Sequence, residues 1–110
     1  MTESAIQIAV MQHLRLRARD AVAFHVPNGG ARSKAAAGRF KAEGVEPGAP
    51  DVCIVFRGQF YGLELKAARG RVSPAQRVMH ERLRAAGGHV AVAYGLDAAL
   101  AQLEAWGLLR

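Results

Sequence analysis

The segment from residue 51 to residue 66 constrains the fold more than any other part of the chain. Two short runs, DVCIVF at 51–56 and FYGLELK at 60–66, are rich in β-branched and aromatic residues, and Arg-Gly-Gln at 57–59 separates them. Two such runs joined by a short glycine-containing turn predict a β-hairpin. This hairpin is the centre of the predicted sheet.

The flanking sequence supplies helices and two more strands. Apolar residues recur at every fourth position from Ile6 to Leu14, which predicts an amphipathic helix from about residue 4 to residue 19. The remaining predicted elements are helices at 32–43, 73–86 and 97–106 and strands at 21–26 and 89–94. The order α-β-α-β-β-α-β-α predicts one α/β domain over residues 1–110, with a mixed central β-sheet flanked by helices.

The charge balance points to a polyanionic partner or to simple solubility. Fifteen Lys and Arg residues stand against nine Asp and Glu, which gives a net charge of +6 and a sequence pI near 10.5. A positive field of this kind attracts nucleic acid or an acidic membrane surface. Charge that serves only solubility explains the same numbers equally well.

Cysteine usage and hydropathy restrict the environment of the chain. Cys53 is the only cysteine and lies in an apolar run, so no disulfide and no cysteine-based zinc site is expected. We expect a buried, reduced thiol. Since no apolar stretch approaches the roughly 18 residues of a membrane span, and no basic-then-apolar leader is present, we expect a soluble cytoplasmic protein with no membrane partner.

The ends of the hairpin strands carry a set of charged residues. Asp51 begins one strand, and Glu64 and Lys66 lie near the end of the other. Glu64 and Lys66 are two residues apart, so their side chains leave the same face of the strand. Hairpin pairing then brings Asp51 roughly opposite them. Two carboxylates and an ammonium therefore converge, although a solvated strand end or a structural Lys–Glu pair is the more common origin of such charges.

Two neighbouring carboxylates favour a divalent cation between them, because they otherwise repel. Mg²⁺ takes oxygen ligands and keeps several waters, so Asp51, Glu64 and the main-chain carbonyl of Leu65 suffice as protein ligands. Such an ion polarises a scissile phosphate and lowers the pKa of a coordinated water. Lys66 would orient or help deprotonate that water and offset negative charge in the transition state. We expect Mg²⁺, with Mn²⁺ as the alternative, and no organic cofactor.

The chain resembles a known nuclease family along most of its length. Pro50-Asp51 followed by Glu64-Leu65-Lys66 is similar to the PD-(D/E)xK signature, which is weak by itself. The surrounding segments appear in the order and spacing of the VRR-NUC (virus-type replication-repair nuclease) family: Val26-Pro27-Asn28-Gly29-Gly30, Gly44 to Asp51, Leu63 to Lys66, and Gly70 to Gln76. The resemblance runs from Glu3 to Trp106.

This resemblance implies a restriction-endonuclease-like core and a set of site residues. Asp51 and Glu64 would be metal ligands, and Lys66 the catalytic lysine. Gln76 would reach back to the site from the helix after the hairpin, and Glu3 on the first helix would complete the metal-binding set. Stand-alone family members of this length resemble Holliday-junction resolvases and act as homodimers. The resemblance thus implies a metal-dependent endonuclease that acts on branched DNA in repair. A short, compact, basic nuclease suits a phage or mobile-element setting.

Two residues of the 73–86 helix have alternative interpretations. Ser73, Pro74 and Gln76 form a predicted capping box, so the amide of Gln76 serves the helix end, the active site or both. His80 lies one turn further on the same face. A single histidine there is more often a surface residue than a catalyst, and we expect it at the surface.

Basic residues on both sides of the hairpin are candidate phosphate contacts. The predicted basic DNA-binding residues are Arg32, Lys34, Arg39, Lys41, Arg69, Arg71 and Arg77. Asn28 is added because the backbone N–H groups of residues 28–30 could approach a phosphate, although a simple turn explains this segment as well. Basic runs are also common on plain solvated faces. The chain has one Trp and few other aromatic residues, which disfavours base stacking and favours recognition of DNA shape.

Two alternative functions and one structural choice remain at the level of sequence. The first alternative is a nuclease that cuts flap, nicked or linear DNA in place of junctions, and the second is a non-catalytic DNA-binding module of the same fold. The apolar last helix would either complete the core, which we favour slightly, or form the dimer surface.

Overall fold

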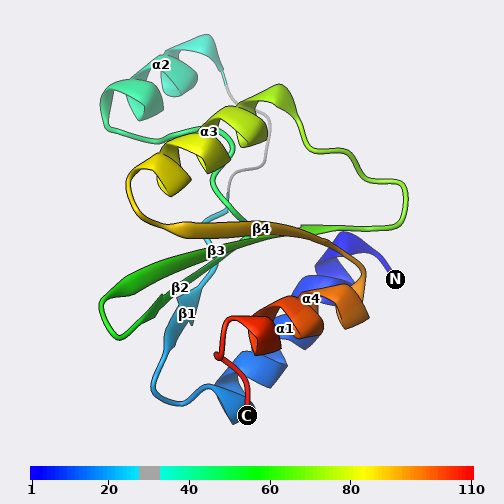
Figure 1. Cartoon of the computed structure of the whole chain (residues 1–110). Helices are drawn as coiled ribbons and strands as arrows, with labels where there is room; N and C mark the ends of the chain where they lie inside the picture. Colours follow the sequence, from blue (N-terminus) through cyan, green and yellow to red (C-terminus); the bar gives the residue numbers. More distant parts are fainter. Residues whose placement is uncertain (28–32) are drawn as a thin grey trace.

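A computed structural model describes residues 1–27 and 33–110 of the chain (Figure 1). Its elements follow the predicted order: α1 (Glu3–Arg17), β1 (Val22–Phe24), α2 (Lys34–Ala42), β2 (Val52–Phe56), β3 (Gln59–Lys66), α3 (Pro74–Ala85), β4 (His89–Tyr94) and α4 (Leu96–Ala105). This order confirms the α/β class and the element order predicted from the sequence.

None of the helices in residues 1–27 and 33–110 combines the length and the hydropathy of a membrane span.

The sheet is mixed, with strand order β1-β2-β3-β4. The pairs β1–β2 and β2–β3 are antiparallel, whereas β3 and β4 are parallel. The hairpin turn uses Arg57 and Gly58 at φ values of 49° and 78°, the left-handed conformation that tight hairpin turns require. This turn pairs Val52 with Leu63, so Asp51, one residue before β2, lies next to Glu64.

The two faces of β3 have different partners. Tyr61, Leu63 and Leu65 point into an apolar core that α1 and α4 close from one side (Figure 1). The alternate residues, Glu64 and Lys66, point to the opposite face, which α3 covers. The core also buries side chains of both covering helices: Ile6, Val10, Leu14, Ala99 and Leu103.

The connection into β2 is held in place by close packing. Gly48 has φ +83°, and a Cβ there would come within 2.4 Å of the Ala75 carbonyl oxygen in α3. Pro50 is fully buried, and a Cβ on Gly62 would lie 2.6 Å from its ring. Because the turn touches both α3 and β3, its packing fixes the chain where Asp51 begins.

Other sequence predictions are confirmed or shortened by the structure. Cys53 is a free, buried cysteine, as expected, and burial raises the pKa of its thiol. Strand β1 has three residues, fewer than the predicted 21–26, because the ladder ends at the Phe24–Cys53 pair. Beyond this pair, the Asp51 carbonyl oxygen is hydrogen-bonded to Nδ1 of the His25 side chain, at 2.6 Å, and not to a strand N–H.

The C-terminal helix contributes to the core of the chain. Leu103 of α4 and Leu108, which follows the helix, are buried, at 0% and 3% exposed. Leu100 and Trp106 pack against the same cluster, and the Trp106 ring lies 5.2 Å from the Tyr61 ring. This packing agrees with the interpretation of the helix as part of the core.

Candidate active site

Asp51 is fixed on both its backbone and its side chain. Its Oδ2 atom accepts a hydrogen bond from the Leu65 N–H at 2.8 Å, and its carbonyl oxygen lies 2.6 Å from Nδ1 of His25. Strand β2 starts one residue later, at Val52. The Asp51 carboxylate therefore accepts the Leu65 hydrogen bond that a strand carbonyl would otherwise accept. The sequence prediction that Asp51 lies opposite residues 64–66 is confirmed.

Glu64 is buried beneath the site surface, with 1% of its area exposed. Its Oε2 atom accepts a hydrogen bond from Nε2 of Gln76 at 3.1 Å and is 3.6 Å from Nζ of Lys66. Its Oε1 atom is buried without a hydrogen bond to any described residue. The structural Lys–Glu pair is therefore present, but it occupies only one of the two carboxylate oxygens.

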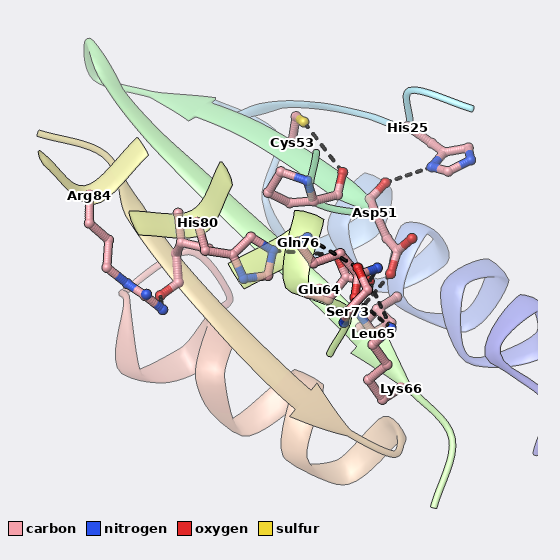
Figure 2. A network of polar contacts seen from close by, with 12 residues as sticks. His25, Asp51, Cys53, Glu64, Leu65, Lys66, Ser73, Gln76, His80 and Arg84 are labelled. Carbon is pink, nitrogen blue, oxygen red and sulfur yellow. Dashed lines mark hydrogen bonds and ion pairs between the residues drawn. The ribbon is translucent and has the colours of Figure 1, made fainter. Parts of the chain in front are cut away.

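Gln76 connects the start of α3 to the two charged residues of β3 (Figure 2). Its Oε1 atom accepts from the Ser73 N–H at 2.9 Å and from Nζ of Lys66 at 3.0 Å, while its Nε2 donates to Glu64. The predicted capping box is formed, and the same amide also contacts Glu64 and Lys66. A catalytic role for Gln76 stays a prediction.

The electrostatics of the site disfavour an ionised Glu64 in the protein alone. Burial, followed by the hydrogen-bonding and charge of Asp51, raises the pKa of Glu64 from 4.5 to about 8, and Lys66 opposes this rise only in part. Two carboxylates that face each other in a water-poor place cannot both be charged at low cost. A positive charge placed next to the two carboxylates would favour the ionised form of Glu64.

Glu3 lies close to the same cluster. Glu3 and Lys66 both border Gly70. A Cβ added to this glycine would lie 3.2 Å from a Glu3 carboxylate oxygen and 3.1 Å from the Lys66 side chain. Within residues 1–27 and 33–110, however, no group of three or more His, Cys, Asp or Glu side chains is arranged to hold a metal ion. The role of Glu3 as a ligand therefore stays a prediction.

Three of the predicted DNA-binding residues lie near the carboxylates along the chain. Arg69 and Arg71 belong to the connection that follows Lys66, and Arg77 lies in the first turn of α3. All three are exposed. Their positions leave the guanidinium groups accessible to a phosphate backbone.

The other predicted contacts lie further away or outside the described residues. Lys34, Arg39 and Lys41 are exposed on α2, a helix with no buried residue that lies on the outer side of α3 (Figure 1). Asn28 and Arg32 fall in residues 28–32, outside the part of the chain that the structure describes. The DNA-binding role of these five residues stays a prediction.

The expectation that His80 is a surface residue is wrong. The residue is 2% exposed, and its Nε2 atom is 3.6 Å from Oε1 of Glu64. Burial, with a smaller contribution from Arg84, lowers the pKa of its imidazole. The available sequence signal was its spacing of four residues from Gln76, which puts both side chains on the face that α3 turns to the sheet.

Comparison with known proteins agrees with this geometry. The sequence model of the VRR-NUC domain matches residues 1–97. A solved structure described as a VRR-NUC domain protein superposes with a TM-score of 0.70 at 24% identity, covering 94% of this chain and 86% of that chain. A second, described as a VRR-NUC domain, gives 0.65 at 21% identity, covering 94% and 97%.

These two structures, both under 25% identical, establish the fold, which is restriction-endonuclease-like as predicted. No curated protein matches the chain. The family assignment depends on the sequence model, which covers most of the 110 residues. This protein belongs to the VRR-NUC family and has a nuclease-type domain.

Proposed function

We propose that this protein is a Mg²⁺-dependent DNA endonuclease whose active site consists of Asp51, Glu64 and Lys66. The observation that carries the proposal is the buried Glu64 carboxylate, 1% exposed, which faces Asp51 and has its pKa raised to about 8. A buried acid beside a lysine and a second, half-buried carboxylate is costly for stability alone. Strongly perturbed acids of this kind are concentrated at functional sites.

The donor set suits a hard divalent cation. Glu64 has one buried oxygen without a hydrogen bond to the described residues, and the neighbouring Asp51 carboxylate adds a second oxygen donor. The Leu65 N–H points to Asp51, and since the N–H and C=O of one strand residue point to the same edge, its carbonyl oxygen does so too. Two carboxylates and a carbonyl are enough for Mg²⁺ or Mn²⁺, which keep part of their water shell.

Such an ion would polarise the scissile phosphate and supply a nucleophilic water at neutral pH. The protein's own residues then orient the reaction. Gln76 holds Nζ of Lys66 at 3.0 Å, which directs the ammonium beside Glu64. From there Lys66 would orient the attacking water and offset negative charge that develops on the phosphate.

The surface charge supports a DNA substrate held by its backbone. The chain carries a net charge of +6, and the exposed Arg69, Arg71 and Arg77 follow the site residues closely. Contacts from arginine to phosphate oxygens carry no information about the base sequence. We therefore propose that recognition depends on DNA shape.

A branched substrate and a homodimer are the finer parts of the proposal. Two sites related by a twofold axis would suit a four-way junction, because equivalent strands are then cut symmetrically. Flap, nicked or linear DNA is the alternative substrate class. The presence of Asp51, Glu64 and Lys66 disfavours the second alternative, a non-catalytic DNA-binding module.

A panel of labelled substrates tests these parts together. Four-way junction, flap, nicked and linear DNA are incubated with the protein in Mg²⁺, in EDTA, and with Lys66→Ala in Mg²⁺. Symmetric, metal-dependent cuts confined to the junction would support a resolvase. Cleavage of all substrates would keep the nuclease and reject junction specificity, and tight binding with no cleavage would favour the binding module. Analytical ultracentrifugation of the same protein tests the dimer.

A further inference from the structure

His80 is a buried polar residue that the proposed site does not yet use. Among the residues that the structure describes, the buried polar or charged side chains are Glu64, Lys66 and His80. The first two belong to the proposed active site. Buried titratable groups are rare unless they are paired, so the third needs its own explanation.

The two oxygens of Glu64 face two different side chains of α3. Gln76 and His80 are four residues apart, so both leave the same face of the helix. Nε2 of Gln76 donates to Oε2 of Glu64 at 3.1 Å, whereas Nε2 of His80 is 3.6 Å from Oε1. Figure 2 shows the His80 ring pointing toward Glu64 and Gln76.

Packing alone does not account for an imidazole at this position. Oε1 of Glu64 and Nε2 of His80 are buried side-chain atoms without a hydrogen bond to any described residue. Leaving such a group unpaired costs about 1–3 kcal/mol. An apolar side chain, like that of the neighbouring buried Met79, would fill the space without this cost.

We infer that His80 is a positioning residue for Glu64. When the ionised carboxylate holds a divalent cation, Nε2 of His80 donates to one lone pair of Oε1, and the second lone pair of Oε1 stays available to the cation. Gln76 fixes the other oxygen, so the two residues of α3 together set the rotation of the carboxylate plane. This inference rests on the proposed metal-dependent function. Loss of such an outer hydrogen bond typically weakens metal affinity or activity by about 10–100-fold.

The test measures Mn²⁺ binding to the DNA-free protein by calorimetry. His80→Leu removes the donor and keeps apolar bulk, whereas His80→Gln restores an amide N–H within similar reach. Val78→Ala, at a position 60% exposed on α3, is the matched control. We expect His80→Leu to bind Mn²⁺ about tenfold or more weakly, His80→Gln to recover most of the affinity, and the control to match the wild type.

Cleavage kinetics give a second readout. With His80→Leu, the Mg²⁺ concentration for half-maximal activity should rise by about the same factor as the Mn²⁺ dissociation constant, while KM for DNA stays constant. Equal Mn²⁺ affinity in wild type and His80→Leu would overturn the inference, and so would equal losses in the Leu and Gln variants. A wild type that binds no Mn²⁺ would instead reject the metal site on which the inference depends.

A measurement on the wild type keeps the test decisive if His80→Leu does not fold. Nitrogen NMR of the histidine rings follows Nε2 of His80 as Mg²⁺ is added. We expect its resonance to shift, and to stay fixed in Glu64→Gln. An unmoved His80 resonance in a wild type that binds Mg²⁺ would overturn the positioning role.

Discussion

Replacing Glu64 by glutamine should stabilise the metal-free protein at high pH. The pKa of Glu64 is raised in the folded state from 4.5 to about 8, first by burial and then by Asp51. Between these two values the folded chain binds more protons than the unfolded chain, so the free energy of unfolding falls as pH rises. It levels off above the folded pKa, where the ionised carboxylate is present in both states.

The size of the effect follows from the same two values. Their difference corresponds to a loss of up to about 5 kcal/mol of unfolding free energy across this window. Glutamine resembles the protonated acid and does not titrate, so Glu64→Gln should lack this loss. Above about pH 8 the variant should therefore be more stable than the wild type by a similar amount.

Urea unfolding followed by circular dichroism, in EDTA and from about pH 5 to about pH 9, measures this difference. Glu43→Gln, at a side chain 59% exposed, controls for the loss of one negative charge. Unfolding free energies of wild type and Glu64→Gln that run parallel over this range would refute the reasoning. They would show that Glu64 is ionised in the folded protein without cost.

Other substitutions separate packing, positioning and DNA contact. Gly48→Ala combines φ +83° with a clash at 2.4 Å from the Ala75 carbonyl oxygen, so unfolding free energy should fall by about 3 kcal/mol or more. Gly58→Ala, at φ +78° in open space, should lose only about 1 kcal/mol in the same urea assay, and equal losses would reject the packing argument. Gln76→Ala removes bonds to Glu64 and Lys66, so kcat should fall by about tenfold or more while DNA affinity, measured by fluorescence anisotropy, is retained. Arg71→Gln should reduce the slope of log affinity against log salt by about 0.9 for duplex DNA, and an unchanged slope would remove Arg71 from the interface.

The hairpin and its charged ends could be predicted because local rules decide them. The turn at Arg57 and Gly58 sets the strand register, and the two-residue alternation of a strand puts Glu64 and Lys66 on one face. The capping box at Ser73 and Gln76 is likewise a local signal. The position of the central site residues therefore follows from sequence spacing.

What the sequence did not reveal depends on contacts between distant elements. Whether His80 is buried depends on how α3 lies over the sheet, and helix periodicity alone does not give that orientation. The bond from His25 to the Asp51 carbonyl joins the end of β1 to the start of β2. Gly62 has no local role visible in the sequence, but its missing side chain makes room for Pro50.

Single-turnover cleavage of a labelled four-way junction by wild type and Lys66→Met tests the central claim most directly. Both proteins are first matched for folding by circular dichroism and for junction binding in Ca²⁺. We predict cleavage by the wild type in Mg²⁺, none in EDTA, and none by Lys66→Met in Mg²⁺ despite retained binding. Cleavage by the wild type in EDTA, or by Lys66→Met at the wild-type rate, would contradict a metal-dependent site built from Asp51, Glu64 and Lys66.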